Sequence, residues 1–260
     1  MTEIWAHRGA RLVAPENTLA AFAAAAEVGA DGVELDVHLT ADGRLTVRHD
    51  PLLTLPDGSV VPLAQLTRAE VAQADVGDAG SGVHRVPHLS EVLELLSPTS
   101  MRVNVEIKVG TKAPYRGIGE AVASAVRGAR WADRVVVSSF DHVGLLEVRE
   151  HAPGLELAPL YADGLARPWD YAAMLGVKAM HPFAPTLQRP GTVESFRAAG
   201  IAVRPWTVID PAEMRAFMQA EVDAVIVDDP ATAIAVRDVV AAGAKGDASR
   251  EGGGLAPALI

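Results

Sequence analysis

The chain has 260 residues, of which 49% are hydrophobic and 22% charged, a composition ordinary for one large globular domain. It contains no cysteine, which excludes a thiolate nucleophile, a disulfide framework and a cysteine-ligated zinc site. Its 23 basic and 33 acidic residues give a formal net charge of −10. A nucleic-acid groove needs a basic footprint and is therefore not expected.

The N-terminal sequence MTEIWAHRGA has no basic segment followed by an apolar segment, so no signal peptide is expected. No stretch of the chain approaches the roughly 20 apolar residues that span a membrane. We therefore expect a cytoplasmic protein with no stable membrane insertion.

Apolar, β-branched runs alternate with amphipathic stretches along the chain. Strands are predicted at residues 3–9, 31–40, 44–50, 102–108, 134–140, 155–161, 177–182, 201–208 and 222–229. Helices are predicted at residues 17–30, 89–96, 115–129, 142–153, 192–200, 211–220 and 230–243. Glycines at 29, 176 and 200 stand between a helical stretch and the next strand, where a left-handed helix stop is expected.

This repeated strand–helix alternation predicts a parallel sheet with right-handed crossovers. Two architectures compete, a doubly wound open sheet and a closed (β/α)8 barrel. About eight strand–helix units favour the barrel. No G-x-G-x-x-G sequence follows the first strand, which removes the best support for a dinucleotide-binding sheet. We therefore predict an α/β fold of the (β/α)8 TIM-barrel type.

Two stretches interrupt the alternation. Residues 50–87 are rich in Pro, Gly and Asp and contain one predicted short helix around Arg68–Ala74, so we interpret them as a small insertion after the second barrel strand. Residues 243–260 are of low complexity and are expected to form a disordered tail. The predicted domain is then a single barrel over residues 1–242.

The segment GVELDVHLT places Glu34 and Asp36 two residues apart on a strand, so their side chains share one face. Two carboxylates facing a barrel interior would repel and be desolvated, which a divalent cation between them relieves. A solvated edge strand is the alternative. The apolar residues that alternate with them favour the metal site.

The segment RVNVEIK repeats this pattern, with Glu106 and Lys108 on one face. Read alone, the pair could be an internal ion pair. Read with Glu34 and Asp36, Glu106 completes a set of three carboxylates. Such all-oxygen ligands suit Mg²⁺ or Ca²⁺. Lys108 would then stand at the rim as a positive charge for a phosphoryl oxygen.

His7 and His49 each end a strand-like run, where barrel active sites assemble. A lone histidine is more often structural, but two in equivalent positions beside carboxylates predict an acid/base pair. Arg8 offers a planar fork for phosphate, with a surface ion pair as the alternative.

Several segments together resemble the glycerophosphodiester phosphodiesterase family. They occur in family order between Ile4 and about Pro230, and they are AHRGARLVAPENTLAAF, GADGVELDVHLTADGRLTVRHDP, VNVEIK, VVVSSFD and VRPWTV. The resemblance implies a TIM barrel with a small insertion after the second strand. It also implies one divalent cation, held by Glu34, Asp36 and Glu106. His7 and His49 would form the acid/base pair. Arg8 and Lys108 would bind the phosphate, and Trp206 would line the alcohol side of the pocket.

The sequence departs from the family pattern at Val227, because AVIVDDP stands where the family shows a Thr-Asp pair before the proline. Within the PENT segment, Asn17 or Thr18 is expected to cap the first helix. Three alternative roles are open for Glu16: it anchors Arg8, it reaches the outer shell of the metal, or it caps the helix.

By this resemblance the expected reaction is hydrolysis of glycerophosphodiesters to sn-glycerol 3-phosphate and an alcohol, with His7 as base and His49 as acid. The partner is a small-molecule substrate. Two alternative functions are a related phospholipase D of the sphingomyelinase type and a catalytically silent barrel that binds a phosphorylated metabolite. The absence of cysteine disfavours the first, and the paired histidines disfavour the second, because binding alone needs no acid/base couple. The sequence leaves open which alcohol head group is preferred and whether the metal is Mg²⁺ or Ca²⁺. It also leaves open whether water or a hydroxyl of the substrate attacks, and what the oligomeric state is.

Overall fold

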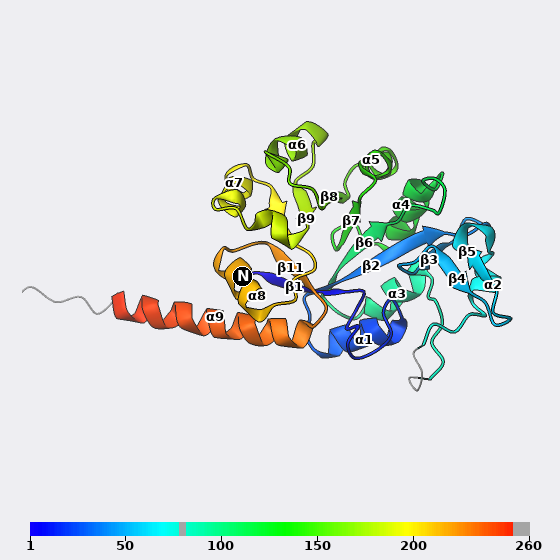
Figure 1. Cartoon of the computed structure of the whole chain (residues 1–260), viewed down its shortest axis with the longest axis horizontal. Helices are drawn as coiled ribbons and strands as arrows, with labels where there is room; N and C mark the ends of the chain where they lie inside the picture. The colour runs from blue at the N-terminus through cyan, green and yellow to red at the C-terminus, as the bar shows by residue number, and fades with distance from the viewer. Residues whose placement is uncertain (78–81, 252–260) are drawn as a thin grey trace, which may run out of the picture.

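A computed structural model of the chain describes residues 1–77 and 82–251, with side chains as far as Gly243. Within these residues eight parallel strands form a nearly closed barrel (Figure 1), which confirms the predicted fold class. The barrel strands are β1 (Glu3–His7), β2 (Gly32–Leu39), β6 (Arg102–Ile107), β7 (Val135–Ser139), β8 (Glu156–Tyr161), β9 (Ala179–Pro182), β10 (Ala202–Val203) and β11 (Ala224–Val227).

The ring of strands closes between β10 and β11. The strands pair in the order β10-β9-β8-β7-β6-β2-β1-β11, and single hydrogen bonds, not a regular ladder, join β11 to the segment that follows β10. The Ile226 amide donates to the Pro205 carbonyl at 3.0 Å, and the Val208 amide donates to the Ile226 carbonyl at 2.9 Å. The first and last barrel strands, β1 and β11, are thus neighbours.

Helices surround the barrel, as Figure 1 shows. They are α1 (Leu19–Glu27), α3 (Leu89–Leu96), α4 (Ile118–Ala129), α5 (His142–His151), α6 (Pro168–Leu175), α7 (Thr192–Ala198), α8 (Pro211–Gln219) and α9 (Pro230–Glu251). Alternate residues of the strands pack outward against these helices, including Val33, Leu35 and Val103. The opposite residues fill the interior, where Trp5 and Ile226 form a second, smaller core. This inside–outside alternation is what positions charged residues inside the barrel.

One helix was not predicted. Helix α6 has a proline in its first turn and ends at Gly176, which adopts the left-handed conformation with φ of 66°. Its eight residues hold too few repeats of the helical period for the pattern to stand out from the surrounding loop. The predicted left-handed stops at Gly29 and Gly200 are confirmed, with φ of 84° and 67°.

The insertion contains more structure than the single short helix predicted for it. It forms a hairpin of β4 (Leu52–Thr54) and β5 (Val60–Pro62), a 3-10 turn η1 (Leu63–Gln65) and helix α2 (Arg68–Val71). These elements bury a small core of their own, formed by Leu53, Leu63, Leu66, Val71, Ala74 and Val86. The insertion therefore packs as a small unit beside the barrel.

The predicted strand at 44–50 is not a barrel strand. It forms β3 (Leu45–Val47), which runs antiparallel to β2, with Val37 opposite Val47. The run before His49 is therefore not equivalent to the barrel strand that ends at His7, contrary to the expectation from the sequence. The chain instead turns back along β2 and carries His49 to the level of Asp36, whose carbonyl accepts from the Arg48 amide at 3.0 Å.

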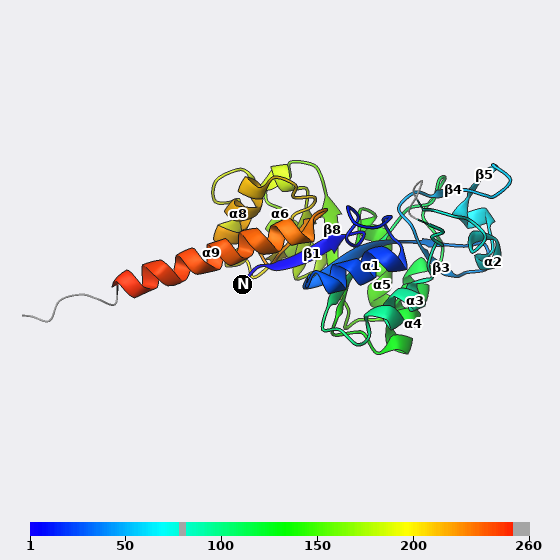
Figure 2. The ribbon, with the colours of Figure 1, turned by 90° about the horizontal axis from the view of Figure 1, so that it is seen from below.

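Helix α9 projects from the barrel at the end opposite the insertion (Figures 1 and 2). It continues to Glu251, past the predicted domain boundary at 242. Residues 252–260 lie outside the described residues, and the expected tail stays a prediction there. Among the helices of the described residues, none has both the length and the apolar character needed to cross a membrane.

Candidate active site

Three buried carboxylates meet inside the barrel, toward the C-terminal ends of β2 and β6. Glu34 and Asp36 are alternate residues of β2, and the register places Asp36 beside Glu106 of β6. One oxygen of each carboxylate lies within 4.8 Å of the others. The residues predicted to form a metal site are thus brought together by strand alternation and by a parallel register.

Two cations and one amide contact this acidic cluster. Lys108 Nζ lies 2.7 Å from Glu106 Oε1 and 3.3 Å from Asp36 Oδ1. Arg8 Nε lies 3.4 Å from Asp36 Oδ2, and Asn17 Nδ2 donates to the same oxygen at 2.8 Å. The internal Glu106–Lys108 ion pair considered from the sequence is therefore present within a larger cluster. Asn17 was considered only as a helix cap.

The carboxylates differ in how they hold protons. Burial, together with the charges of Asp36 and Glu106, raises the pKa of Glu34 well above its usual value. Burial and the Asp36 charge raise the pKa of Glu106 to about 7. Burial acts in the same direction on Asp36, but Lys108 and Arg8 outweigh it and lower the pKa of that carboxyl. Asp36 is therefore the carboxylate that the cations keep ionised.

The cluster fits a hard divalent cation. Among the described residues no hydrogen-bond partner reaches Glu34 Oε1, although this oxygen is buried. An unpaired buried acceptor costs free energy, and the raised pKa values of Glu34 and Glu106 reflect carboxyl groups that are buried beside other negative charge. Three carboxylates at this spacing are the oxygen donors that Mg²⁺ and Ca²⁺ take. Glu34, Asp36 and Glu106 are thus suited to hold one such ion.

His7 forms a tight pair with an aspartate from the other end of the barrel sequence. His7 Nδ1 lies 2.7 Å from Asp228 Oδ1, and His7 Nε2 lies 4.0 Å from Glu34 Oε2. Burial raises the pKa of Asp228, but the His7 hydrogen bond and charge outweigh it and lower that pKa overall. Asp228 was not predicted as a site residue. Its position directly after β11, at the C-terminal end of a barrel strand, was the available signal.

His49 reaches the site from the segment that follows β3. Its Nδ1 lies 2.9 Å from Asp50 Oδ1, and 36% of its side chain is exposed. A small cavity of about 40 Å³ borders His49 and Asn17. Both histidines therefore have a carboxylate at Nδ1, which leaves each Nε2 available for proton transfer.

A tight turn directs Arg8 back over the acidic cluster. Arg8 and Gly9 both have positive φ, 59° and 80°, and a Cβ on Gly9 would lie 2.7 Å from the Ala21 carbonyl carbon. Only glycine fits this close approach between the turn and helix α1. Arg8 Nη1 then pairs with Glu16 Oε1 at 2.8 Å, so Glu16 anchors Arg8. The helix cap is Thr18, whose side chain accepts from the Ala21 amide.

Trp206 stands beyond the end of β10 in an aromatic cluster. Its ring packs against Phe140 and Phe183, with centroids 5.4 and 5.3 Å away. The indole Nε1 donates to the carbonyl of His181 at 2.8 Å. The His181 ring itself is fully buried in the barrel interior, where Arg204 Nη1 lies 3.3 Å from its Nε2.

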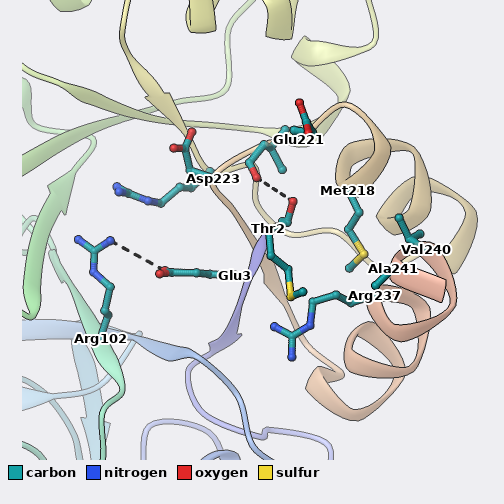
Figure 3. Close-up of a pocket in the computed structure, with 12 residues that line it drawn as sticks. Thr2, Glu3, Arg102, Met218, Glu221, Asp223, Arg237, Val240 and Ala241 are labelled. Atoms are coloured by element: carbon teal, nitrogen blue, oxygen red, sulfur yellow. Dashed lines mark hydrogen bonds and ion pairs between the residues drawn. The ribbon is translucent and has the colours of Figure 1, made fainter. Parts of the chain in front are cut away.

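A larger cavity of about 500 Å³ opens at the other end of the barrel (Figure 3). It is lined by residues at or before the starts of strands, including Glu3, Arg102 and Asp223, and by Arg237. Its arginines are paired with carboxylates, as in the contact of Arg102 with Glu156 at 2.7 Å. Barrel chemistry takes place at the opposite, C-terminal end, where the acidic cluster lies.

Comparison with known proteins agrees with this geometry. A model of the Glycerophosphoryl diester phosphodiesterase family matches residues 7–232. A glycerophosphodiester phosphodiesterase of Caldanaerobacter subterraneus is 39% identical over 237 residues, covering 90% of this chain and 96% of the relative. Another, of Bacillus altitudinis, is 35% identical over 246 residues, covering 92% and 99%.

Solved structures agree as well. The crystal structure of a glycerophosphodiester phosphodiesterase from Agrobacterium tumefaciens has a TM-score of 0.78 at 30% identity, covering 90% of this chain and all of that one. An Oleispira antarctica phosphodiesterase in complex with the product sn-glycerol-3-phosphate has a TM-score of 0.80 at 25% identity, covering 92% and 97%. The family match, the identities and the shared barrel show that the chain belongs to the glycerophosphoryl diester phosphodiesterase family and is an enzyme of that class.

Proposed function

We propose that this enzyme hydrolyses glycerophosphodiesters to sn-glycerol 3-phosphate and an alcohol, with one divalent cation and a pair of histidines. The observation that carries the proposal is the convergence of Glu34, Asp36 and Glu106 on one buried point, beside cations and histidines. The product bound by the Oleispira antarctica phosphodiesterase supports the same reaction. The net charge of −10 agrees with a small-molecule substrate and not a nucleic acid.

In this proposal Glu34, Asp36 and Glu106 hold the cation, Mg²⁺ or Ca²⁺. When bound, the ion neutralises phosphate charge and lowers the pKa of an oxygen nucleophile. The two nearby cations serve the phosphate itself. Arg8 offers a planar pair of donors and Lys108 a point charge, and both stabilise the oxygens on which charge builds during attack.

The histidines divide the proton transfers. The Asp228 carboxylate accepts from His7 Nδ1–H, so His7 Nε2 has a free lone pair and acts as the general base on the attacking hydroxyl. His49, more exposed and paired with Asp50, gives its proton to the departing alcohol. Trp206 and its aromatic neighbours line the side of the site from which that alcohol leaves.

The test measures release of glycerol 3-phosphate from glycerophosphocholine with Mg²⁺ or Ca²⁺, and again with excess EDTA. Release should stop in EDTA and return when the ion is restored. His7→Ala and His49→Ala should each lower turnover at least ~10²-fold with the barrel folded. His151→Ala, an exposed histidine at the end of α5, is the matched control and should be active. Full turnover in EDTA contradicts the metal role, and normal rates for either site variant contradict its proton transfer.

The absence of cysteine fits a reducing compartment, and we place the reaction in the cytoplasm on that ground.

A further inference from the structure

His38 is a fully buried histidine with no part in the proposed chemistry. It lies on β2 two residues beyond Asp36, so it shares the face of the strand that carries the acidic cluster. Both of its ring nitrogens are engaged. Nδ1 lies 2.9 Å from the hydroxyl of Tyr115, and Nε2 lies 3.0 Å from the backbone carbonyl of His49.

The partners of His38 determine where its proton lies. A backbone carbonyl can only accept, so Nε2 must carry the hydrogen that it donates to the His49 oxygen. Nδ1 then has a free lone pair and accepts from the hydroxyl of Tyr115. The result is a chain of two hydrogen bonds with one direction, from Tyr115 through a neutral His38 to the backbone of His49.

This chain ends on the irregular segment that carries His49. His49 lies between β3 and β4 in irregular backbone, and its imidazole is partly exposed. The Arg48 amide fixes one point of the segment by donating to the Asp36 carbonyl at 3.0 Å. The His38 bond fixes the next residue by its carbonyl. Two successive anchors on β2 define where the Cα of His49, and hence its ring, is placed.

Tyr115 brings in a second part of the site. It belongs to the loop that follows β6 and precedes α4, the same loop that begins with Lys108. Its ring meets the His38 ring edge-on, with centroids 5.6 Å apart. The loop that carries Lys108 and the segment that carries His49 are therefore linked through a single buried ring, that of His38.

We propose that His38 and Tyr115 are positioning residues that hold His49 in place to protonate the leaving alcohol. The inference rests on the acid role given to His49 under the proposed function. Its chemical consequence is selective: displacing His49 slows the departure of a poor leaving group and spares a leaving group that needs no proton.

The test compares two substrates with the same glycerol phosphate part. Choline is a poor leaving group that needs a proton, whereas p-nitrophenolate departs unprotonated. His38→Leu should lower kcat for glycerophosphocholine roughly 10- to 100-fold, because small displacements of a catalytic group cost this much. It should leave kcat for the p-nitrophenyl ester within about threefold of wild type. His38→Gln, whose amide retains one donor and one acceptor, should recover the choline rate to within about threefold.

Tyr115→Phe tests the same pair of hydrogen bonds and leaves the buried ring of His38 in place. Loss of one hydrogen bond should lower kcat for glycerophosphocholine about 3- to 10-fold with KM unchanged. Tyr171→Phe is the matched control. Tyr171 Oη lies 2.9 Å from the ring of His142, which in turn bonds the Leu160 carbonyl, away from every proposed catalytic residue. It should leave both substrates unaffected.

The outcomes separate this inference from the proposed function. If His49→Ala slows both substrates equally, the acid role of His49 is wrong. If His49→Ala is selective but Tyr115→Phe and His38→Leu slow both substrates equally, or slow neither, the positioning role is wrong. Should His38→Leu fail to fold, Tyr115→Phe and His38→Gln decide the matter through the same ratio of choline to p-nitrophenyl rates.

Discussion

Replacement of Glu106 by Gln should make the metal-free protein more stable at neutral and higher pH. In the folded protein the pKa of Glu106 is raised from 4.5 to about 7, chiefly by burial. Between these values the folded state keeps a proton that the unfolded state releases, so stability falls as pH rises through the window. Each tenfold change in proton affinity is worth about 1.4 kcal/mol, so the loss amounts to about 3 kcal/mol.

Glutamine carries no titrating proton, so Glu106→Gln should abolish this loss. In EDTA the variant and the wild type should unfold at the same urea concentration near pH 4.5, and the variant should gain about 3 kcal/mol over the wild type by pH 8. Addition of Mg²⁺ or Ca²⁺ should stabilise the wild type, by about 2.7 kcal/mol at a hundred times the dissociation constant, and should stabilise the variant less. A wild type that is the more stable of the two at pH 8 in EDTA would refute the reasoning.

Three further predictions concern other contacts. Asp228→Asn should lower kcat ~10²-fold with KM within a few-fold in steady-state assays, because the amide no longer holds the proton on His7 Nδ1; an unchanged kcat contradicts that role. Glu156→Gln should destabilise the protein in urea unfolding at pH 7, and progressively less as the pH falls below the ordinary glutamate pKa of about 4.3, since Arg204 and Arg102 outweigh burial and lower the pKa of Glu156, and a depressed carboxyl pKa loses its stabilising effect as pH falls; a destabilisation that does not change with pH contradicts the ion pairing. Gly9→Ala should cost about 1–3 kcal/mol or more, and more than Gly43→Ala, which also has positive φ but open space at Cβ; equal costs contradict the close approach.

The barrel was predictable because apolar, β-branched runs alternate with amphipathic stretches in about eight strand–helix units along the sequence. The acidic cluster was predictable for the same reason, since Glu34 and Asp36 must share a face and a parallel register brings Glu106 alongside. The paired histidines were predicted as candidates from their place at the ends of strand-like runs.

The sequence pattern could not predict features that depend on contacts between distant segments. The direction of β3 is set by pairing with β2 and not by its own residues, which are as compatible with a parallel strand. The roles of Glu16 and Asn17 were open because a short polar segment offers several partners, and only the turn at Arg8 and Gly9 selects among them. Asp228 can be recognised as the partner of His7 only when the pairing of β11 with β1 is known.

The pairing of β1 with β11 has a consequence for when the enzyme becomes active during its synthesis. His7 leaves the ribosome 221 residues before its carboxylate partner, Asp228. Until that last strand emerges, the β1 edge has no neighbour on one side, and the histidine lacks the contact that orients it. A nascent chain can therefore assemble the acidic cluster on β2 and β6 before the proposed base is oriented, so under the proposed function turnover would begin only when β11 has paired with β1.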